Sequence, residues 1–317
     1  MIYIENFQEG QHIIGHYLCK DKQAMKTRAG KTYYNVLLMD KTGTAMGKIW
    51  DMTPQIGDFN KQEFIKIDAN VTVFQGDIQL NINRVRRSDE GEYDPADYMQ
   101  VTKKDPQEMF LQILTRIDEV QNPYLKRLLE SYFVEDEAFI NKFMIHPAAK
   151  NVHHNFVGGL LEHVSTVMEI CCYLGTLYSG VNRDLLIAGA LFHDIGKMEE
   201  LEPMPHNEYS DAGQLLGHIA IGYGMVRDRI RTIEGFPAEL EQLLEHMILS
   251  HHGELEFGSP KVPSSMEAMI LHLADNADAK MKMLEEFIGQ DKSEGRWTAY
   301  NRLLARNFYK MEDETEG

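Results

Sequence analysis

The chain has 317 residues, of which 43% are hydrophobic and 26% are charged, and this composition is typical of a folded protein of two or three domains. No apolar run approaches the ~18 residues that a membrane span requires, and the first residues, MIYIENFQEGQH, lack the basic start and apolar core of a leader. We therefore expect a cytoplasmic protein without a membrane partner. The three cysteines include no Cys-x-x-Cys pair, which excludes a disulfide framework and a cysteine-type zinc site, so any metal must be bound by histidines and carboxylates.

The net charge of −17 is unevenly distributed along the chain. Residues 1–90 contain 12 Lys and Arg against 11 Asp and Glu, for a net charge of +1, and the remaining residues carry −18. Because Lys and Arg supply most of the non-specific affinity for a phosphate backbone, the acidic part argues against a general nucleic-acid binder. The two parts have different surfaces, and we expect them to have different functions.

Residues 1–90 show the short alternating pattern of β structure. Residues 33–40 and 45–50 are two strand-like runs joined by a glycine-containing turn, as in a hairpin. Residues 64–74 turn at Gly76 into a run in which Ile78, Leu80 and Ile82 alternate with polar residues. About five such strands, with interleaved lysines and aromatic residues, resemble an OB-fold of the nucleic-acid-binding kind.

This resemblance implies an N-terminal barrel that binds single strands on its surface. The candidate nucleic-acid contacts are Tyr33, Tyr34, Trp50, Arg84, Arg86 and Arg87. In the alternative interpretation, Tyr33, Tyr34, Trp50 and Phe74 belong to the core and the arginines form a solvated strand end.

From about residue 91 the apolar residues follow a helical period. Residues 91–150 are predicted to form a helical linker subdomain in which Asn122-Pro123 marks a helix boundary. Residues 151–290 form the next predicted domain. Residues 291–317 are predicted to be a C-terminal helix with an acidic tail.

Most of the 13 histidines lie between residues 146 and 272, several of them at positions that interrupt apolar helices. A buried imidazole or carboxylate must be paired or bound to a metal, because desolvating it alone is costly. One such histidine is more often a hydrogen-bonded core residue, but here five predicted helices each contribute a ligand. Imidazoles with carboxylates suit Mn, Fe, Zn or Ni, and the adjacent pair His193-Asp194 allows Asp194 to bridge two ions.

The ordered pattern His163, His193-Asp194 and Asp275, with HDIGK at residues 193–197, resembles the HD-domain superfamily of metal-dependent phosphohydrolases. The resemblance covers about residues 150–290 and implies an all-α helical bundle. The expected fold class is therefore a multidomain α and β protein, with an OB-like β-barrel followed by an HD-domain bundle. The implied metal ligands are His163, His193, Asp194, His218, His251, His252 and Asp275, of which the additional histidines resemble those that bind a second ion in binuclear members.

The segment HHNFVGGLLEH, joined to an N-terminal OB-like domain, resembles the YhaM-type 3′-to-5′ exoribonucleases. This resemblance implies a manganese-dependent enzyme with two ions that releases nucleoside monophosphates from single-stranded RNA, and it leaves single-stranded DNA and a homo-oligomer open. Our catalytic candidates are Asp194, Lys197 and His154. Metal-activated water at Asp194 would attack the phosphorus while Lys197 and His154 hold the phosphate oxygens.

Three assignments have more than one interpretation. His252 is a ligand, a support for a ligand, or a substrate contact, and His154 equally well caps the following helix. Asp278, three residues after Asp275, either orients a metal-bound histidine or forms a surface ion pair.

Other functions compete with the exoribonuclease hypothesis. An HD-GYP-type cyclic-dinucleotide phosphodiesterase also uses a paired His-His, but HHGELEFGSPKVP has Gly-Ser-Pro where that family has Gly-Tyr-Pro. A nucleotidase or dNTP hydrolase would leave the OB-like domain without a role. Outside enzymes, the alternative is a non-catalytic single-stranded nucleic-acid-binding factor with a structural metal. The number of ligands argues against it, because structural sites rarely need more than four.

Overall fold

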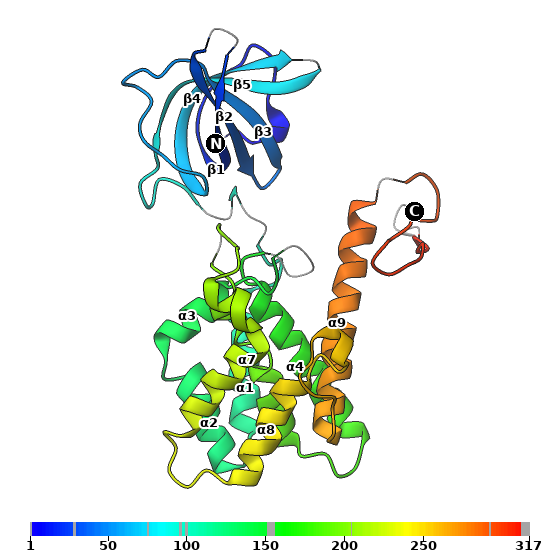
Figure 1. Cartoon of the computed structure of the whole chain (residues 1–317). Coiled ribbons are helices and arrows are strands. Elements are labelled where there is room, and N and C mark those ends of the chain that lie inside the picture. Colours follow the sequence, from blue (N-terminus) through cyan, green and yellow to red (C-terminus); the bar gives the residue numbers. More distant parts are fainter. Residues whose placement is uncertain are drawn as a thin grey trace. The chain divides into compact units, whose positions relative to one another are not determined.

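The computed structural model describes residues 2–27, 30–74, 76–94, 97–98, 101–150, 156–203, 205–291 and 293–311. The chain divides into two compact units (Figure 1). The first comprises Met1–Val101 and Met204–His206, and the second comprises Thr102–Pro203 and Asn207–Gly317.

The first unit is a closed five-stranded barrel in the strand order β1-β2-β3-β5-β4. Its strands are β1 (His12–Lys26), β2 (Thr32–Asp40), β3 (Gly43–Ile49), β4 (Glu63–Phe74) and β5 (Asp77–Arg87). β1 pairs with both β2 and β4, and β3 pairs with β5 in parallel, which closes the barrel. The predicted OB-like barrel is confirmed by this arrangement.

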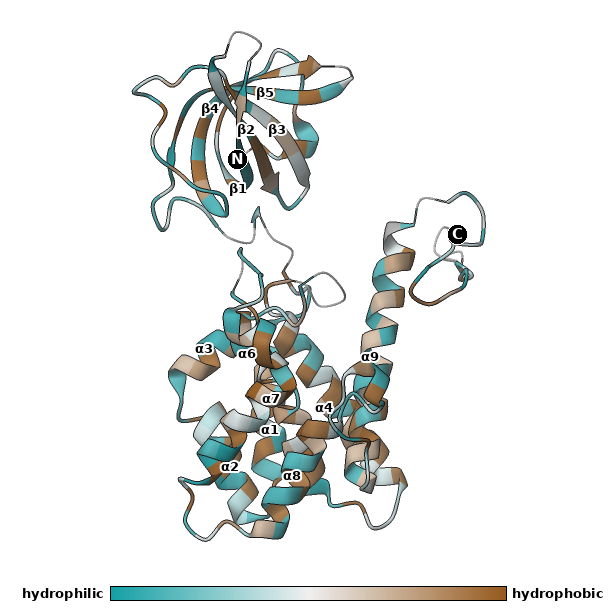
Figure 2. Ribbon diagram, viewed as in Figure 1, coloured by the Kyte–Doolittle hydropathy of each residue, from teal (hydrophilic) through white to brown (hydrophobic). Residues whose placement is uncertain are grey.

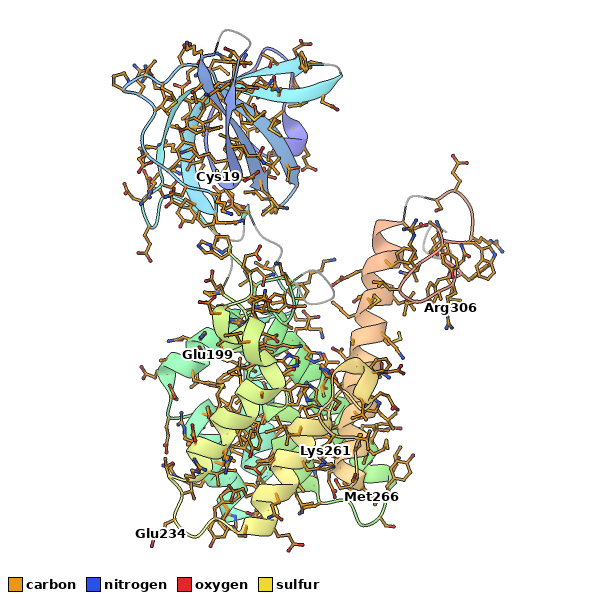
Figure 3. All side chains as sticks on the ribbon, in the orientation of Figure 1. Cys19, Glu199, Glu234, Lys261, Met266 and Arg306 are labelled. Carbon is orange, nitrogen blue, oxygen red and sulfur yellow. The ribbon has the colours of Figure 1, made fainter. Side chains whose placement is uncertain are left out.

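Alternating side chains build the barrel core. In β5, Leu80 and Ile82 are buried whereas Asn83 is exposed, as the sequence pattern predicts. Figure 2 shows hydrophobic and hydrophilic residues alternating along β4, and Figure 3 shows side chains filling the barrel around Cys19. A methyl group at Gly47 would lie 2.6 Å from the Cδ1 atom of Ile82, so a larger residue there would force the Ile82 side chain to move.

The second unit is built of helices around one hydrophobic core. The helices are α1 (Pro106–Glu119), α2 (Pro123–Phe133), α3 (Glu137–Ile145), α4 (Gly159–Leu177), α5 (Arg183–Phe192), α6 (Lys197–Glu200), α7 (Asp211–Ile230), α8 (Ala238–Ser250) and α9 (Met266–Gln290). Among the helices of the described residues, none combines the length and the apolarity needed to cross a membrane.

Side-chain caps define where several of these helices begin. The Asn122 side chain accepts hydrogen bonds from the amides of Tyr124 and Leu125, and Pro123 occupies the first helical position, so the predicted boundary at Asn122-Pro123 is confirmed. Ser265 caps α9 in the same way through the amide of Ala268. These caps fix the starting points of helices whose apolar faces then pack into the core.

The segment after α9 differs from the predicted C-terminal helix. Residues 293–311 form a loop with β-bridges between Trp297 and Tyr309 and between Asn301 and Arg306, the last of which is labelled in Figure 3. The Asp291 carboxylate accepts from the amide of Ala299 and so ties this loop to the end of α9. Local side-chain hydrogen bonds of this kind compete with helix formation. The acidic residues 312–317 lie outside the described part of the chain.

Candidate metal centre

Asp194 lies in the tight connection between α5 and α6. A methyl group at Gly196 would lie 2.6 Å from the nitrogen of Gly222 and closer still to the carbonyl oxygen of His218. The glycine of the HDIGK motif therefore allows α6 and α7 to approach each other. This close approach brings His218 of α7 toward Asp194.

One group of donors faces the Oδ2 atom of Asp194. The Nε2 atom of His163, on α4, lies 3.2 Å from that oxygen and 3.3 Å from Oδ1 of Asp275, on α9. The Nε2 atom of His193 lies 3.4 Å from the same Asp194 oxygen. His163, His193 and Asp275 thus offer ligand atoms that all lie within 4.8 Å of one another.

A second group faces the other oxygen of Asp194. The Nε2 atoms of His218 and His251 lie 3.5 Å and 3.6 Å from Oδ1. Together with His252, which follows α8, they form another set with ligand atoms within 4.8 Å of one another. The structure therefore brings together all seven residues predicted as metal ligands, with Asp194 between two groups of three.

The five imidazoles of the two groups share one orientation. The Nδ1 atoms of His163, His193, His218, His251 and His252 lie 2.7–3.0 Å from Asp278 Oδ2, Ala190 O, Glu200 Oε1, Ile248 O and Phe257 O, respectively. Carbonyl and carboxylate oxygens accept hydrogen bonds, so each Nδ1 donates and each Nε2 is the nitrogen that faces the centre and is left to bind an ion. This is the arrangement that metal-bound histidines adopt in proteins.

Several potential ligand atoms at the centre have no hydrogen-bond partner among the described residues. Asp194 Oδ1, His218 Nε2 and His251 Nε2 are buried without a hydrogen bond among the described residues, an arrangement that is costly unless an ion completes it. Metal–ligand bonds of about 2.0–2.2 Å place neighbouring donors on one ion roughly 3.0–3.5 Å apart. The Nε2-to-Asp194 distances of 3.2–3.6 Å agree with that spacing, so the residues fit two divalent ions, one beside each Asp194 oxygen.

Glu200 positions His218, and its role was missed in the sequence. α7 is kinked at Gly217, whose φ of 73° is in the left-handed region that favours glycine. The kink directs the backbone amide of His218 to Glu200 Oε1, at 2.8 Å, while Nδ1 of the same residue donates to that oxygen. Nothing in the run KMEEL distinguishes Glu200 from a surface carboxylate, so only the fold could show it.

His272 is a second residue that was missed. Its Nδ1 atom lies 2.9 Å from the carbonyl oxygen of His251, to which it donates. A methyl group at Gly253, where φ is 82°, would collide with the His272 ring. His272 thus fixes the turn that carries His251 and His252. A glycine directly after the paired histidines and a histidine one turn before Asp275 are the available sequence signals.

The Lys197 ammonium lies 2.6 Å from Asp194 Oδ2. Burial by itself raises the pKa of Asp194, but Lys197 and the neighbouring imidazoles outweigh burial and hold that pKa well below its usual range. Burial lowers the pKa values of His251 and His252, which favours their neutral, metal-binding forms. The pKa of His163 is instead raised, against the effect of burial, by Asp194 and two further carboxylates, so an ion bound there would displace a proton.

Two other residues from the sequence analysis have different outcomes. Asp278 is buried and accepts from His163 Nδ1, so its interpretation as a surface ion pair is wrong and its interpretation as an orienting group is supported. His154 lies outside the described residues, and its proposed phosphate contact stays a prediction.

An aromatic patch covers part of the barrel surface. The rings of Tyr33 and Trp50 stack with centroids 4.8 Å apart, and the Lys48 ammonium lies 5.0 Å from the Trp50 ring and 5.4 Å from the Phe74 ring. Trp50 is 40% exposed and Phe74 55% exposed, so the alternative that they are core residues is wrong. Tyr34 is half-buried against the barrel core, as that alternative expected. We call Tyr33, Lys48, Trp50 and Phe74 the aromatic patch.

The arginine cluster of β5 is paired with carboxylates of the same barrel. Arg86 forms a two-pronged contact with Glu92, at 2.6 and 2.7 Å. Arg87 lies 2.8 Å from Glu63, and Arg84 lies 3.9 Å from Asp68. These pairs reduce the positive charge that the cluster offers to a phosphate backbone and favour its interpretation as a solvated strand end.

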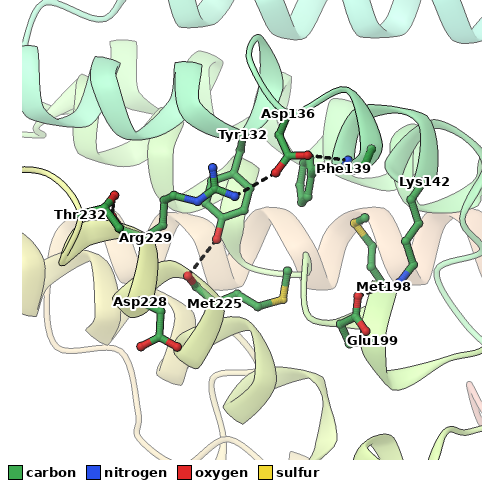
Figure 4. Close-up of a pocket in the computed structure, with 11 residues that line it drawn as sticks. Tyr132, Asp136, Phe139, Lys142, Met198, Glu199, Met225, Asp228, Arg229 and Thr232 are labelled. Carbon is green, nitrogen blue, oxygen red and sulfur yellow. Dashed lines mark hydrogen bonds and ion pairs between the residues drawn. The ribbon is translucent and has the colours of Figure 1, made fainter.

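A separate hollow of about 500 Å³ lies beside α6, away from the donors (Figure 4). Its charged side chains are already paired, since Arg229 contacts Asp136 at 2.9 Å and Lys142 contacts Glu199 at 2.7 Å. None of the predicted site residues lines it, and we assign it no ligand.

Solved structures similar to this chain include OB-fold domains that match less than a third of its length. The second OB-fold domain of replication protein A from Methanococcus maripaludis is 12% identical with a TM-score of 0.23, over 28% of this chain and 96% of that one. An OB domain from Methanosarcina mazei is 17% identical with a TM-score of 0.23, over 27% and 82% of the two chains. An OB domain from Thermoplasma acidophilum is 17% identical with a TM-score of 0.22, over 30% and 90%. The OB-like assignment rests on the strand order of the barrel itself.

Part of the helical unit matches the sequence model of a protein family. Residues 160–280 match the model of the HD domain, and this range contains every residue of the two donor groups and Asp194. The part of the resemblance that concerns the HD domain is thereby confirmed. The chain consists of an OB-like barrel followed by a helical region that contains an HD domain, the domain of metal-dependent phosphohydrolases.

Proposed function

We propose that the protein is a metal-dependent 3′-to-5′ exoribonuclease that hydrolyses single-stranded RNA to nucleoside monophosphates. The observation that carries the proposal is the division of donors around Asp194, with one group of three beside each of its oxygens. A pair of divalent ions bound there would lower the pKa of water and neutralise charge on a phosphodiester.

The charges of the centre suit an anionic substrate despite the acidic surface. Asp194 and Asp275 supply two negative charges, Lys197 supplies one positive charge, and the histidine donors are neutral when they bind ions. Two divalent ions therefore leave the centre positive. The Lys197 ammonium, held at Asp194, lies where it can hold a phosphate oxygen next to the bridging carboxylate.

The barrel supports the choice of a single-stranded substrate. Stacking on exposed rings such as Trp50 and Phe74 is worth about 1–3 kcal/mol per base and tolerates any sequence. Lys48 adds a cation among those rings. The barrel would thus bind a long strand, and the HD domain would hydrolyse its end.

The direction and the sugar of the substrate follow from the resemblance to the YhaM-type enzymes, so the experiment must test both. We would incubate single-stranded RNA labelled at its 5′ end with metal-loaded protein and separate the products by length. A ladder that shortens stepwise from the 3′ end, with release of nucleoside monophosphates, is expected. Internal cuts, or release of oligonucleotides in place of nucleoside monophosphates from the 3′ end, would contradict the proposal.

Asp194→Asn tests the assigned centre in the same assay. The variant keeps the shape of the side chain but loses the bridging charge, and we expect a loss of more than about 100-fold in kcat, beyond the range for residues that only support a ligand. Asp228→Asn, which changes an exposed carboxylate outside both donor groups, is the matched control. Wild-type turnover in Asp194→Asn would overturn the assignment.

Manganese is our proposed ion, although zinc binds histidine sites more tightly in the usual affinity order. Protein stripped with a chelator and reconstituted with single ions should be most active with Mn²⁺. Full activity with Zn²⁺ alone would contradict this assignment.

A further inference from the structure

A groove of about 440 Å³ leads away from the candidate centre along α9. His163, Lys197 and Asp275 form the end of the groove next to the centre. His252 and His272 line it as well, and the groove continues past residues that neither the sequence nor the donor geometry assigned to any role. Its volume lies in the range of pockets that bind small molecules such as a nucleoside.

One face of α9 forms the floor of this groove. Asn276, Ala279, Lys280 and Met283 all line it, and their spacing of three, four and seven residues places them on one side of a helix. From Asn276 to Met283 the helix rises about 10 Å, which is enough for one nucleoside and too short for several. The small side chain of Ala279 leaves room between its larger neighbours.

The polar groups of this floor are available to a ligand. Lys280 is exposed, and no carboxylate among the described residues pairs with it, although this unit of the protein is strongly acidic. Asn276 is half-buried beside Asp275, and its amide has no hydrogen-bond partner among the described residues. An amide and an ammonium one turn apart can each bond a hydroxyl group.

Apolar side chains line the part of the groove where the base of a bound nucleoside would lie. Phe257 is 59% exposed and lines the groove, and its carbonyl oxygen accepts from His252 Nδ1 at 3.0 Å, so its backbone is fixed to the centre. Met283 lines the groove two turns along α9 from Asn276. An exposed ring and a thioether are suited to the face of a nucleobase of any sequence.

We propose that this groove is the binding site for the terminal ribonucleoside of the substrate, with Asn276 and Lys280 bonded to the ribose hydroxyls and Phe257 and Met283 against the base. The proposal rests on the proposed function, because it places the phosphate of that nucleoside at the centre. It makes α9 the element that distinguishes ribose from deoxyribose. Removal of a 2′-hydroxyl leaves a protein group unpaired, which is the physical source of such discrimination.

The test compares kcat/KM for an RNA strand and the DNA strand of the same sequence. Lys280→Ala should lower the value for RNA about 5- to 10-fold and that for DNA less than about twofold, because we assign Lys280 to the 2′-hydroxyl, which only RNA offers. Asn276→Ala should lower both values, because the 3′-hydroxyl assigned to Asn276 is present at the end of either strand. Phe257→Ala should lower both values at least about fivefold, since a base is stacked in either strand.

Matched variants control for charge and exposure. Lys103→Ala removes an exposed lysine of the same unit that does not line the groove. Leu255→Ala changes a side chain that is 67% exposed, lies in the same 3₁₀ turn as Phe257 and does not line the groove. Both should behave like the wild type.

A binding measurement separates failure of the site from failure of the proposed function. Calorimetric titration of the manganese-loaded protein with AMP and with dAMP should show tighter binding of AMP, and Lys280→Ala should remove that difference. If the wild type degrades RNA but Lys280→Ala leaves the RNA-to-DNA ratio and AMP binding unchanged, the subsite is refuted while the function stands. If the wild type degrades no RNA, the function is refuted. AMP binding that depends on Lys280 would still support the subsite, and AMP binding that does not depend on Lys280 would refute it.

Discussion

Substitution of Gly196 by alanine tests whether the close approach of α6 and α7 builds the second ion site. The new methyl group would lie 2.6 Å from the Gly222 nitrogen and closer still to the His218 carbonyl oxygen, whereas ordinary contacts begin near 3.4 Å. The two backbones must therefore separate by at least about 0.8 Å. Overpacking of this kind typically destabilises a protein by about 1–3 kcal/mol.

This displacement should affect one donor group more than the other. His218 Nε2 lies 3.5 Å from Asp194 Oδ1, and a shift of about 0.8 Å or more takes it out of reach of an ion shared with that oxygen. His163 and His193 stand on α4 and at the end of α5, which the methyl group does not touch. We expect Gly196→Ala to bind one manganese ion per chain in place of two.

Manganese stoichiometry, measured by calorimetry and by the loss of a spin-coupled signal in paramagnetic resonance, is the assay. Gly224→Ala is the matched control, because Gly224 lies on the same helix as His218 and a methyl group there meets nothing within 4 Å. The control should keep two ions and the wild-type stability or slightly more. Two tightly bound ions in Gly196→Ala would refute the reasoning.

Three further outcomes are expected. Glu200→Ala should weaken the second manganese ion by about 10- to 100-fold in a binding titration, because His218 loses the acceptor for both its amide and its Nδ1 atom, and unchanged affinity would contradict that role. Trp50→Ala should weaken the binding of a long single strand by about 5-fold or more in a fluorescence titration. Arg86→Ala should change the binding less, because the Arg86 guanidinium is already paired with Glu92, and the reverse order would refute the binding role of the aromatic patch. Burial lowers the pKa of His146 below its ordinary value of 6.5, so the unfolded chain binds the proton first and the free energy of unfolding should fall as the pH drops below about 6.5. Denaturant titrations at several pH values should show a weaker dependence of that free energy on pH in His146→Asn, and an equal dependence would contradict this explanation.

The sequence predicted the residues whose chemistry is unusual for their surroundings. His163 and Asp194 interrupt apolar runs, and such interruptions are visible without a structure because a buried polar group needs a partner. The alternation in β5 likewise predicted the buried face of the barrel at Leu80 and Ile82. Both predictions depend on burial, which produces a periodic pattern of apolar residues in the sequence.

Residues that act by pairing could not be predicted in the same way. Glu200 and Glu92 look alike in the sequence as exposed carboxylates, yet one orients His218 and the other neutralises Arg86. Their partners are 18 and 6 residues away and are brought to them by a kink or a turn. The C-terminal helix was predicted wrongly for the same reason, since side-chain hydrogen bonds to Asp291 compete with helical ones.

The two donor groups differ in the contacts that hold their histidines in place, and this difference predicts which group binds its ion more tightly. His163 and His193 extend from α4 and α5, whose positions are set by the packing of many core residues. His218 depends on the kink at Gly217 and on one oxygen of Glu200, and His251 depends on a turn fixed by His272. Preorganisation by a whole core is more resistant to change than preorganisation by single hydrogen bonds, because local elements open at a lower free energy than the core does. The ion beside Asp194 Oδ2 should therefore bind first and more tightly, and a manganese titration of the wild type should resolve two steps, of which Gly196→Ala and Glu200→Ala weaken only the second.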